Sequence, residues 1–161
     1  LREDLLDAAA AHGLGPSFFQ IHVAFWGSRH RVIFLGPERA ARIDPARSAL
    51  DRGMKMTLHH DAPVEGIDIL EVVCAAVNRR TSSGKLLGPE QAITPYEALR
   101  AVTVDAAWQY FEEDRKGTLE EGKLADLVIL SDNPLAIDPM TIKDIVVLET
   151  LKEGETVYRA E

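Results

Sequence analysis

The 161-residue sequence predicts an α/β fold, in which helices and strands alternate along the chain. Segments with helical spacing or helix-start signals are separated by two segments of apolar and polar alternation, residues 17–25 and 54–61. The predicted order over the first 111 residues is helix, strand, helix, strand, helix, helix, which is typical of layered or barrel α/β folds. From Gly117 onward, glycine-punctuated strands replace this pattern, so we expect a β-rich unit there.

The first half of the α/β pattern contains a helix, a strand and a second helix. Residues 1–13 have apolar positions close to helical spacing and end in a glycine suited to a helix C-terminus. Residues 17–25 alternate strictly enough to predict a mostly buried strand. Its apolar face carries Phe19, Ile21, Val23 and Phe25. The segment 44–53 starts with Asp-Pro and ends with glycine, which predicts a helix with Asp44 as its N-cap.

A second strand and two well-marked helices follow. Residues 54–61 alternate, which places Asp61 at the end of the strand on the same face as His59. Asp68 is the expected N-cap of a helix with an apolar stripe that runs to about residue 80. A Thr-Pro-Tyr-Glu capping box predicts a further helix over residues 94–111.

The last third is expected to be small and rich in strands. Residues 124–130 read as a strand, and an Asp-Pro pair at 138–139 starts a short helical turn. Residues 144–151 and 155–159 flank Lys-Glu-Gly, which predicts a β-hairpin.

Charge and cysteine content exclude several classes of protein. Against 26 acidic residues there are 18 basic ones, giving a net charge of −8, and the basic residues form no cluster. This argues against nucleic acid or an anionic membrane as a partner. The longest apolar runs are far below the ~20 residues that span a bilayer. With one cysteine a disulfide framework is impossible, which fits a reducing compartment, so we expect a cytoplasmic location.

Asp61 is the strongest candidate for a functional residue. Functional groups of α/β barrels and open sheets gather at the carboxyl ends of strands. A carboxylate there could ligate a divalent metal ion, or take a proton from an attacking water and pass it to a leaving group. The alternative is a structural role, in which Asp61 caps the following loop by accepting N–H bonds from residues 62–64.

Three further residues are candidates for contacts with a substrate. His59 shares a strand face with Asp61 and could line a pocket. For His22, a role in a pocket and a purely structural role are equally good interpretations. Trp26 could form an apolar wall, although an aromatic at a strand end usually serves packing. Cys74 lies on an apolar helix face and is expected to be buried and inert. The pair at residues 79–80, Arg-Arg, is expected to be the charged end of a helix.

Residues 94–130, TPYEALRAVTVDAAWQYFEEDRKGTLEEGKLADLVIL, closely resemble the C-terminal signature of the amidohydrolase superfamily. Upstream, SFFQIHVAFWGSRHR and TLHHDAPV resemble the metal-dependent "amidohydrolase 3" branch, which includes N-substituted formamide deformylases. The resemblance implies the C-terminal part of a (β/α)8 TIM-type barrel over residues 1–116. It also implies that residues 117–161 are a β-rich segment of a small composite β-sandwich domain.

The same resemblance implies roles for the candidate residues. Asp61 matches the aspartate at the end of the eighth barrel strand, a metal ligand and general acid/base in the superfamily. His22 resembles a pocket residue at the end of the seventh strand. The implied cofactor is one or two divalent metal ions, with zinc the expected ion, and most of its ligands would belong to earlier strands. The implied reaction is hydrolysis of a non-peptide C–N bond of a small amide-type substrate by a metal-activated water.

Two other functions stay open at this point. The chain could be a non-catalytic structural fragment that pairs with the remaining N-terminal part of the same protein or with itself, as a homo-oligomer, through exposed strand edges. It could also belong to a binding protein with a degenerate barrel. As an isolated piece, we expect the chain to be inactive because most of the metal site would be missing.

Overall fold

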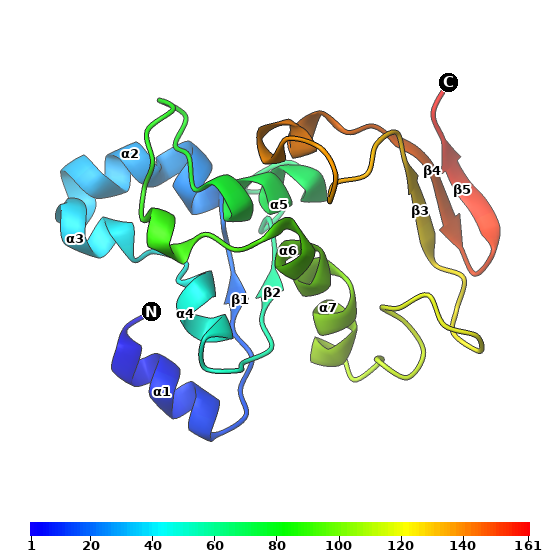
Figure 1. The fold of residues 1–161 in the computed structure, drawn as a ribbon, viewed down its shortest axis with the longest axis horizontal. Helices are drawn as coiled ribbons and strands as arrows, with labels where there is room; N and C mark the ends of the chain where they lie inside the picture. Colours follow the sequence, from blue (N-terminus) through cyan, green and yellow to red (C-terminus); the bar gives the residue numbers. More distant parts are fainter.

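The computed structural model describes residues 1–161 and has an α/β fold built on a pair of parallel strands (Figure 1). Strand β1 (Ser17–Phe18) lies beside β2 (Thr57–Leu58), with Ser17 opposite Thr57. The Thr57 N–H donates to the Pro16 carbonyl at 2.9 Å, and the His59 N–H donates to the Phe18 carbonyl at 3.1 Å. The ladder therefore extends one residue beyond the strand at each end.

Helices surround this pair of strands (Figure 1). Helix α1 precedes β1, and the elements of the crossover from β1 to β2 are all helices, as in the βαβ units of parallel sheets. The bounds are α1 Glu3–Ala11, η1 His22–Trp26, α2 Gly27–Arg29, η2 His30–Phe34, α3 Gly36–Ala41, α4 Ala46–Leu50, α5 Ile69–Asn78, η3 Pro89–Gln91, α6 Pro95–Val102 and α7 Val104–Gln109. None of these helices has the length and the continuous apolar composition of a transmembrane span.

Both predicted strands are shorter than the sequence pattern indicates. The strand predicted over residues 17–25 ends at Phe18, and the π-helix η1 occupies His22–Trp26, so this prediction is wrong from Phe19 onward. Ile21 and Val23 are buried, which a helical turn achieves as well as a strand does. The strand predicted over 54–61 is confined to Thr57–Leu58. Asp61 consequently lies in a turn.

The two strongest helix-start signals are confirmed. The Asp68 carboxylate accepts N–H bonds from Leu70 at 3.0 Å and from Glu71 at 3.4 Å at the start of α5. At the start of α6, Thr94 and Glu97 form the complete capping box. The predicted long helix after it is divided at Thr103, where α6 ends and α7 begins.

Two expectations about charged residues are wrong. Asp44 is not the N-cap of α4: the cap position is Pro45, and Asp44 has a positive φ of 48° with no capping hydrogen bond. Arg79 is not an exposed helix end but is fully buried, with 0% of its surface accessible. Its guanidinium donates to five backbone carbonyls, those of Ala41, Ile43, Asp44, Leu87 and Gly88, and to the Gln20 side chain.

The last third forms a three-stranded antiparallel sheet that lies to one side of the helices (Figure 1). Its strands are β3 Leu127–Leu130, β4 Val147–Lys152 and β5 Glu155–Arg159, in that order across the sheet. The predicted β4–β5 hairpin is confirmed. Between β3 and β4 the chain returns to the helical part through the 3₁₀ helix η4 (Pro139–Asp144), which packs against α5.

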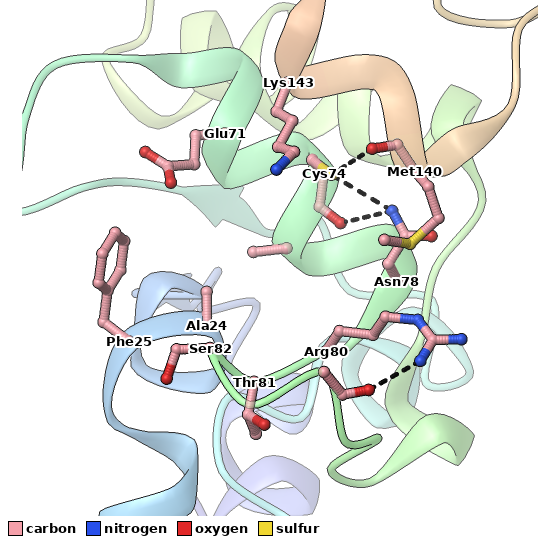
Figure 2. Close-up of a pocket in the computed structure, with 12 residues that line it drawn as sticks. Ala24, Phe25, Glu71, Cys74, Asn78, Arg80, Thr81, Ser82, Met140 and Lys143 are labelled. Carbon is pink, nitrogen blue, oxygen red and sulfur yellow. Dashed lines mark hydrogen bonds between the residues drawn. The ribbon is translucent and has the colours of Figure 1, made fainter.

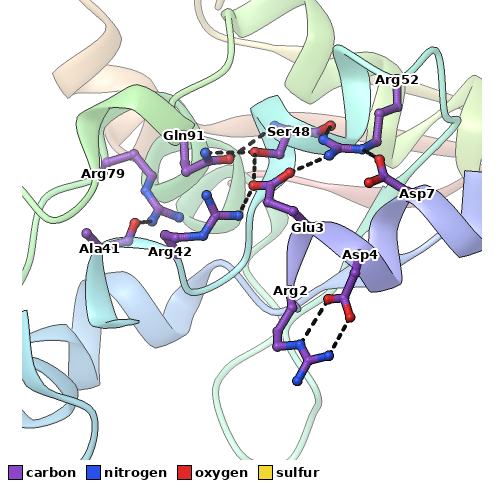
Figure 3. A network of polar contacts seen from close by, with 10 residues as sticks. All are labelled: Arg2, Glu3, Asp4, Asp7, Ala41, Arg42, Ser48, Arg52, Arg79 and Gln91. Atoms are coloured by element: carbon purple, nitrogen blue, oxygen red, sulfur yellow. Dashed lines mark hydrogen bonds and ion pairs between the residues drawn. The ribbon is translucent and has the colours of Figure 1, made fainter. Parts of the chain in front are cut away.

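One main core holds the helical part together. Twenty buried apolar residues form it, from Leu6 of α1 to Ile142 of η4 and Ile145, which directly follows η4. At its surface, a polar network ties α1 to the crossover helices (Figure 3). Glu3 accepts hydrogen bonds from Arg42 and Arg52, and Arg52 also donates to Asp7 at 2.7 Å. These contacts fix the first helix against the segment that precedes β2.

Candidate functional site

Asp61 lies three residues after β2 and is exposed. Its backbone has a φ of 54°, a left-handed conformation that aspartate tolerates better than most residues do. The Asp61 carbonyl accepts the Val64 N–H at 2.9 Å and closes the turn. The carboxylate itself takes part in no hydrogen bond or ion pair, so the loop-capping alternative finds no support in this geometry.

The three predicted substrate contacts lie around one aromatic ring, that of Phe19. The His22 ring is 4.5 Å from it and the Trp26 ring 5.9 Å, measured between ring centroids. On another side, the His59 ring stacks on Phe19 with a centroid distance of 5.6 Å. His59 also shares a 2.7 Å hydrogen bond between its Nδ1 and the Ser17 hydroxyl. The structure therefore brings His22, Trp26 and His59 together, although they come from two segments.

A carboxylate that the sequence did not single out as functional lies beside His22. Oδ2 of Asp44 is 3.4 Å from Nδ1 of His22. The His22 ring also meets His30 edge-on at a centroid distance of 5.4 Å. Burial and the nearby His22 lower the pKa of His30, and the Asp44 charge opposes this only in part.

Sequence reasoning missed three residues of this region. Phe19 was expected to be on the apolar face of a strand, and instead it is the centre of the aromatic cluster formed with His22, Trp26 and His59. Nothing local in the sequence distinguishes Asp44 from an ordinary helix cap, or Arg79 from its neighbour Arg80. Their roles depend on contacts between segments that are far apart in the sequence, such as Gln20 with Asp44 and Asp44 with Arg79.

The described residues do not by themselves form a metal site. They contain no group of three or more His, Cys, Asp or Glu side chains that could hold an ion. A structural zinc site needs four such ligands and a catalytic one usually three. Asp61 offers one exposed carboxylate with no competing partner, which is compatible with a single ligand position and no more.

A separate pocket of about 320 Å³ lies between η1, α5 and η4 (Figure 2). None of the predicted site residues lines it. Cys74 faces this pocket, and burial raises the pKa of its thiol, in agreement with the expectation of an inert cysteine. Burial also raises the pKa of Glu71, with smaller contributions from the acidic neighbours Asp68 and Glu65.

Comparison with known proteins identifies the family of this chain. A sequence model of the amidohydrolase family, in its Amidohydro_3 branch, matches residues 1–158. The chain belongs to the amidohydrolase family. An N-substituted formamide deformylase from Arthrobacter pascens is 32% identical over 117 residues, covering 73% of this chain and 22% of the relative. The chain spans about a quarter of the length of the curated relatives it matches.

Solved structures share the fold of this amidohydrolase chain. An uncharacterised metal-dependent hydrolase from Pyrococcus horikoshii OT3 superposes with a TM-score of 0.72 at 24% identity, over 86% of this chain and 28% of that protein. An adenosine deaminase from Xanthomonas campestris with bound zinc superposes with a TM-score of 0.67 at 18% identity, over 97% of this chain and 34% of the deaminase. The likeness at this level of identity concerns the fold.

Proposed function

We propose that this chain is the C-terminal part of a longer metal-dependent hydrolase that cleaves a non-peptide C–N bond of a small amide-type substrate. The single observation that carries the proposal is the family match over residues 1–158, and Asp61 lies inside it, in the turn three residues after β2. The deformylase relative acts on an N-substituted formamide, according to its name, which supports an amide-type bond as the one cleaved.

The proposal includes the architecture of the complete protein. The parallel strands β1 and β2 would be the last two strands of a (β/α)8 barrel over residues 1–116, and residues 117–161 would contribute to a small β-sandwich. Parallel sheets are normally covered on both faces and continue beyond two strands, which supports this view. Apolar side chains of the three-stranded sheet, among them Val128, Ile129 and Val157, are exposed and would be covered by the rest of the same protein.

In the proposed reaction, Asp61 moves the proton. Its carboxylate would accept a proton from the water that attacks the carbonyl carbon and would deliver that proton to the departing nitrogen. His22, Trp26 and His59 would bind the substrate. The aromatic cluster around Phe19 offers an apolar wall, and the imidazoles offer hydrogen-bonding nitrogens at its edge.

A divalent metal ion, expected to be zinc, would polarise the carbonyl group when bound. The zinc in the Xanthomonas campestris deaminase, whose fold this chain shares, supports the choice of ion. Asp61 would be the one ligand from this chain. The other ligands would come from parts of the complete protein outside residues 1–161.

The test is the substitution Asp61→Asn in the complete protein, assayed on a series of N-substituted formamides and related amides. A neutral side chain of the same shape cannot accept the proton, so kcat should fall by about 100- to 10,000-fold. A matched control is Asp132→Asn, which alters an exposed carboxylate near the end of β3 and should leave kcat unchanged. Circular dichroism must show that both variants keep the fold. Near-normal turnover of folded Asp61→Asn would refute the assignment.

A second experiment tests whether the chain alone is inactive. The isolated chain should neither bind zinc stoichiometrically nor hydrolyse amides, because its residues include no three-ligand group. Stoichiometric zinc binding together with turnover by the isolated chain would show that residues 1–161 contain a complete site. Lack of activity in the complete wild-type protein on every amide tested would favour a binding protein with a degenerate barrel.

A further inference from the structure

The buried guanidinium of Arg79 locks two segments of the candidate site together. Nη1 of Arg79 donates to the Gln20 side-chain oxygen at 3.0 Å and to the Asp44 carbonyl at 3.2 Å. The Gln20 amide closes the triangle by donating to the same Asp44 carbonyl at 3.1 Å. Gln20 and Arg79 are both fully buried, so these bonds are shielded from water. Asp44 is thereby fixed relative to the segment that carries His22, two residues after Gln20.

One oxygen of the Asp44 carboxylate, Oδ2, accepts no hydrogen bond. Its Oδ2 is buried and has no aligned hydrogen-bond partner, and only 13% of the side chain is exposed. A buried acceptor without a donor is costly, and such atoms are rare in folded proteins. The nitrogen of an ionisable group nearest to Oδ2 is Nδ1 of His22, at 3.4 Å.

We propose that Asp44 is a positioning residue that holds His22 in the tautomer with the proton on Nδ1. The carboxylate accepts this N–H, which leaves Nε2 of His22 unprotonated. Because Nδ1 is engaged, Nε2 is the nitrogen left to accept a hydrogen bond from an N–H donor of an amide-type substrate. This inference rests on the proposed function for the identity of the substrate, but the Asp44–His22 pairing does not.

The 3.4 Å separation fits such a pair before a substrate binds. It exceeds the usual N–H···O distance by a few tenths of an ångström, and the geometry is not yet aligned. Functional hydrogen bonds are often long in unliganded enzymes and shorten in the complex. The groups facing the His22 ring are the Asp44 carboxylate, the His30 imidazole, and the rings of Phe19 and Trp26. Of these, only Asp44 is an anion.

The direct test is the ¹⁵N NMR spectrum of the histidine side chains in the complete protein at pH 8. Protonated and unprotonated imidazole nitrogens have distinct ¹⁵N shifts, and the His22→Gln spectrum assigns the His22 signals. Wild-type His22 should carry its proton on Nδ1. In Asp44→Asn the population should shift toward Nε2–H, because the amide oxygen accepts Nδ1–H more weakly than a carboxylate does and the amide N–H₂ can donate to Nδ1 instead. Asparagine also tolerates the φ of 48° at this position, so the backbone need not change.

Two controls separate positioning from a general loss of structure. Asp51→Asn removes an exposed carboxylate seven residues along the chain and should leave the His22 tautomer and the kinetics as in wild type. Asp44→Asn should raise KM or lower kcat about 10- to 100-fold, by analogy with the carboxylates that orient metal-ligating histidines. For substrates that lack an N–H at the cleaved amide, Asp44→Asn should lower kcat/KM less than it does for substrates that have one.

The NMR result decides this inference whatever the outcome of the Asp61→Asn assay. Nε2–H His22 in the wild-type protein would overturn it, and so would a tautomer unchanged in folded Asp44→Asn. If Asp44→Asn does not fold, the wild-type spectrum alone still decides. A confirmed Nδ1–H tautomer combined with fully active Asp61→Asn would retain the Asp44–His22 pairing and refute only the proposed reaction.

Discussion

Replacing Arg79 with methionine should be one of the most destabilising single changes in this chain. Methionine fills a similar volume but donates no hydrogen bond, so six acceptors lose the guanidinium. Two of the carbonyls, those of Asp44 and Gly88, keep a backbone N–H donor. The other four acceptors are the carbonyls of Ala41, Ile43 and Leu87 and the side-chain oxygen of Gln20. At about 1 kcal/mol for each, the free energy of unfolding should fall by about 4 kcal/mol.

Burial of the charge works against Arg79 and limits this figure. Desolvation lowers the pKa of Arg79 to about 10, although Asp44 and Glu90 oppose the shift. The guanidinium still stays charged near neutral pH, so its hydrogen bonds remain charge-assisted. The loss of about 4 kcal/mol in the free energy of unfolding is therefore an upper value. The desolvation energy that is recovered when the buried charge is removed reduces it.

The assay is urea unfolding of the complete protein at pH 7, followed by circular dichroism. The m value grows with the surface exposed on unfolding, so for a larger protein with m of about 4 kcal/mol/M a loss of about 4 kcal/mol lowers the midpoint by about 1 M. Arg80→Met is the matched control, because Arg80 is exposed and donates only to the Gly84 carbonyl within its own loop. It should change stability by less than about 0.5 kcal/mol. Equal midpoints for the two variants would refute the structural role given to Arg79.

Two further predictions concern the backbone near Arg79 and the response to acid. Gly88→Ala would place a Cβ 1.8 Å from the Ala41 carbonyl oxygen, at a residue whose φ is 60°. The free energy of unfolding, measured in urea, should fall by about 3 kcal/mol or more. Gly84→Ala is the control, because Gly84 also has a positive φ but has open space around it, and its loss should be about 1 kcal/mol. Burial alone would raise the pKa of Glu97, but hydrogen bonds from Arg47 and Thr94 outweigh it and hold the pKa below 4.5. The ionised carboxylate therefore stabilises the fold above about pH 4.5, and this contribution is lost as the pH falls through the folded-state pKa. Glu97→Gln should flatten the pH dependence of the urea midpoint between pH 5 and 3 (roughly the range in which a glutamate titrates), and an unchanged slope would contradict this assignment.

Local signals in the sequence predicted the parts of the fold that depend on neighbouring residues. The caps at Asp68 and Thr94 satisfy backbone N–H groups two or three residues away, so they are legible in the sequence and are confirmed. The β4–β5 hairpin is also local, with Glu153 and Gly154 at positive φ in its turn. The family resemblance, carried by long motifs, is confirmed as well.

Features that depend on distant contacts could not be predicted in this way. The alternation over residues 17–25 matches a strand, yet tertiary packing makes its second half helical. Arg79 looks like any charged helix end until the segments around Gln20, Asp44 and Gly88 surround it. The grouping of His22, Trp26 and His59 follows from the parallel pairing of β1 and β2, which places the ends of two separate segments side by side.

The return of the chain to α5 between β3 and β4 has a mechanical consequence. The Asn78 amide donates to the Cys74 carbonyl of α5 at 2.9 Å and to the Pro139 carbonyl of η4 at 2.8 Å. These hydrogen bonds attach the β3–β4 connection to α5. A displacement of the three-stranded sheet away from the helices would therefore strain or break these contacts with α5. Since α5 begins shortly after the Asp61 turn, any force on the C-terminal strands reaches the loop that carries this carboxylate.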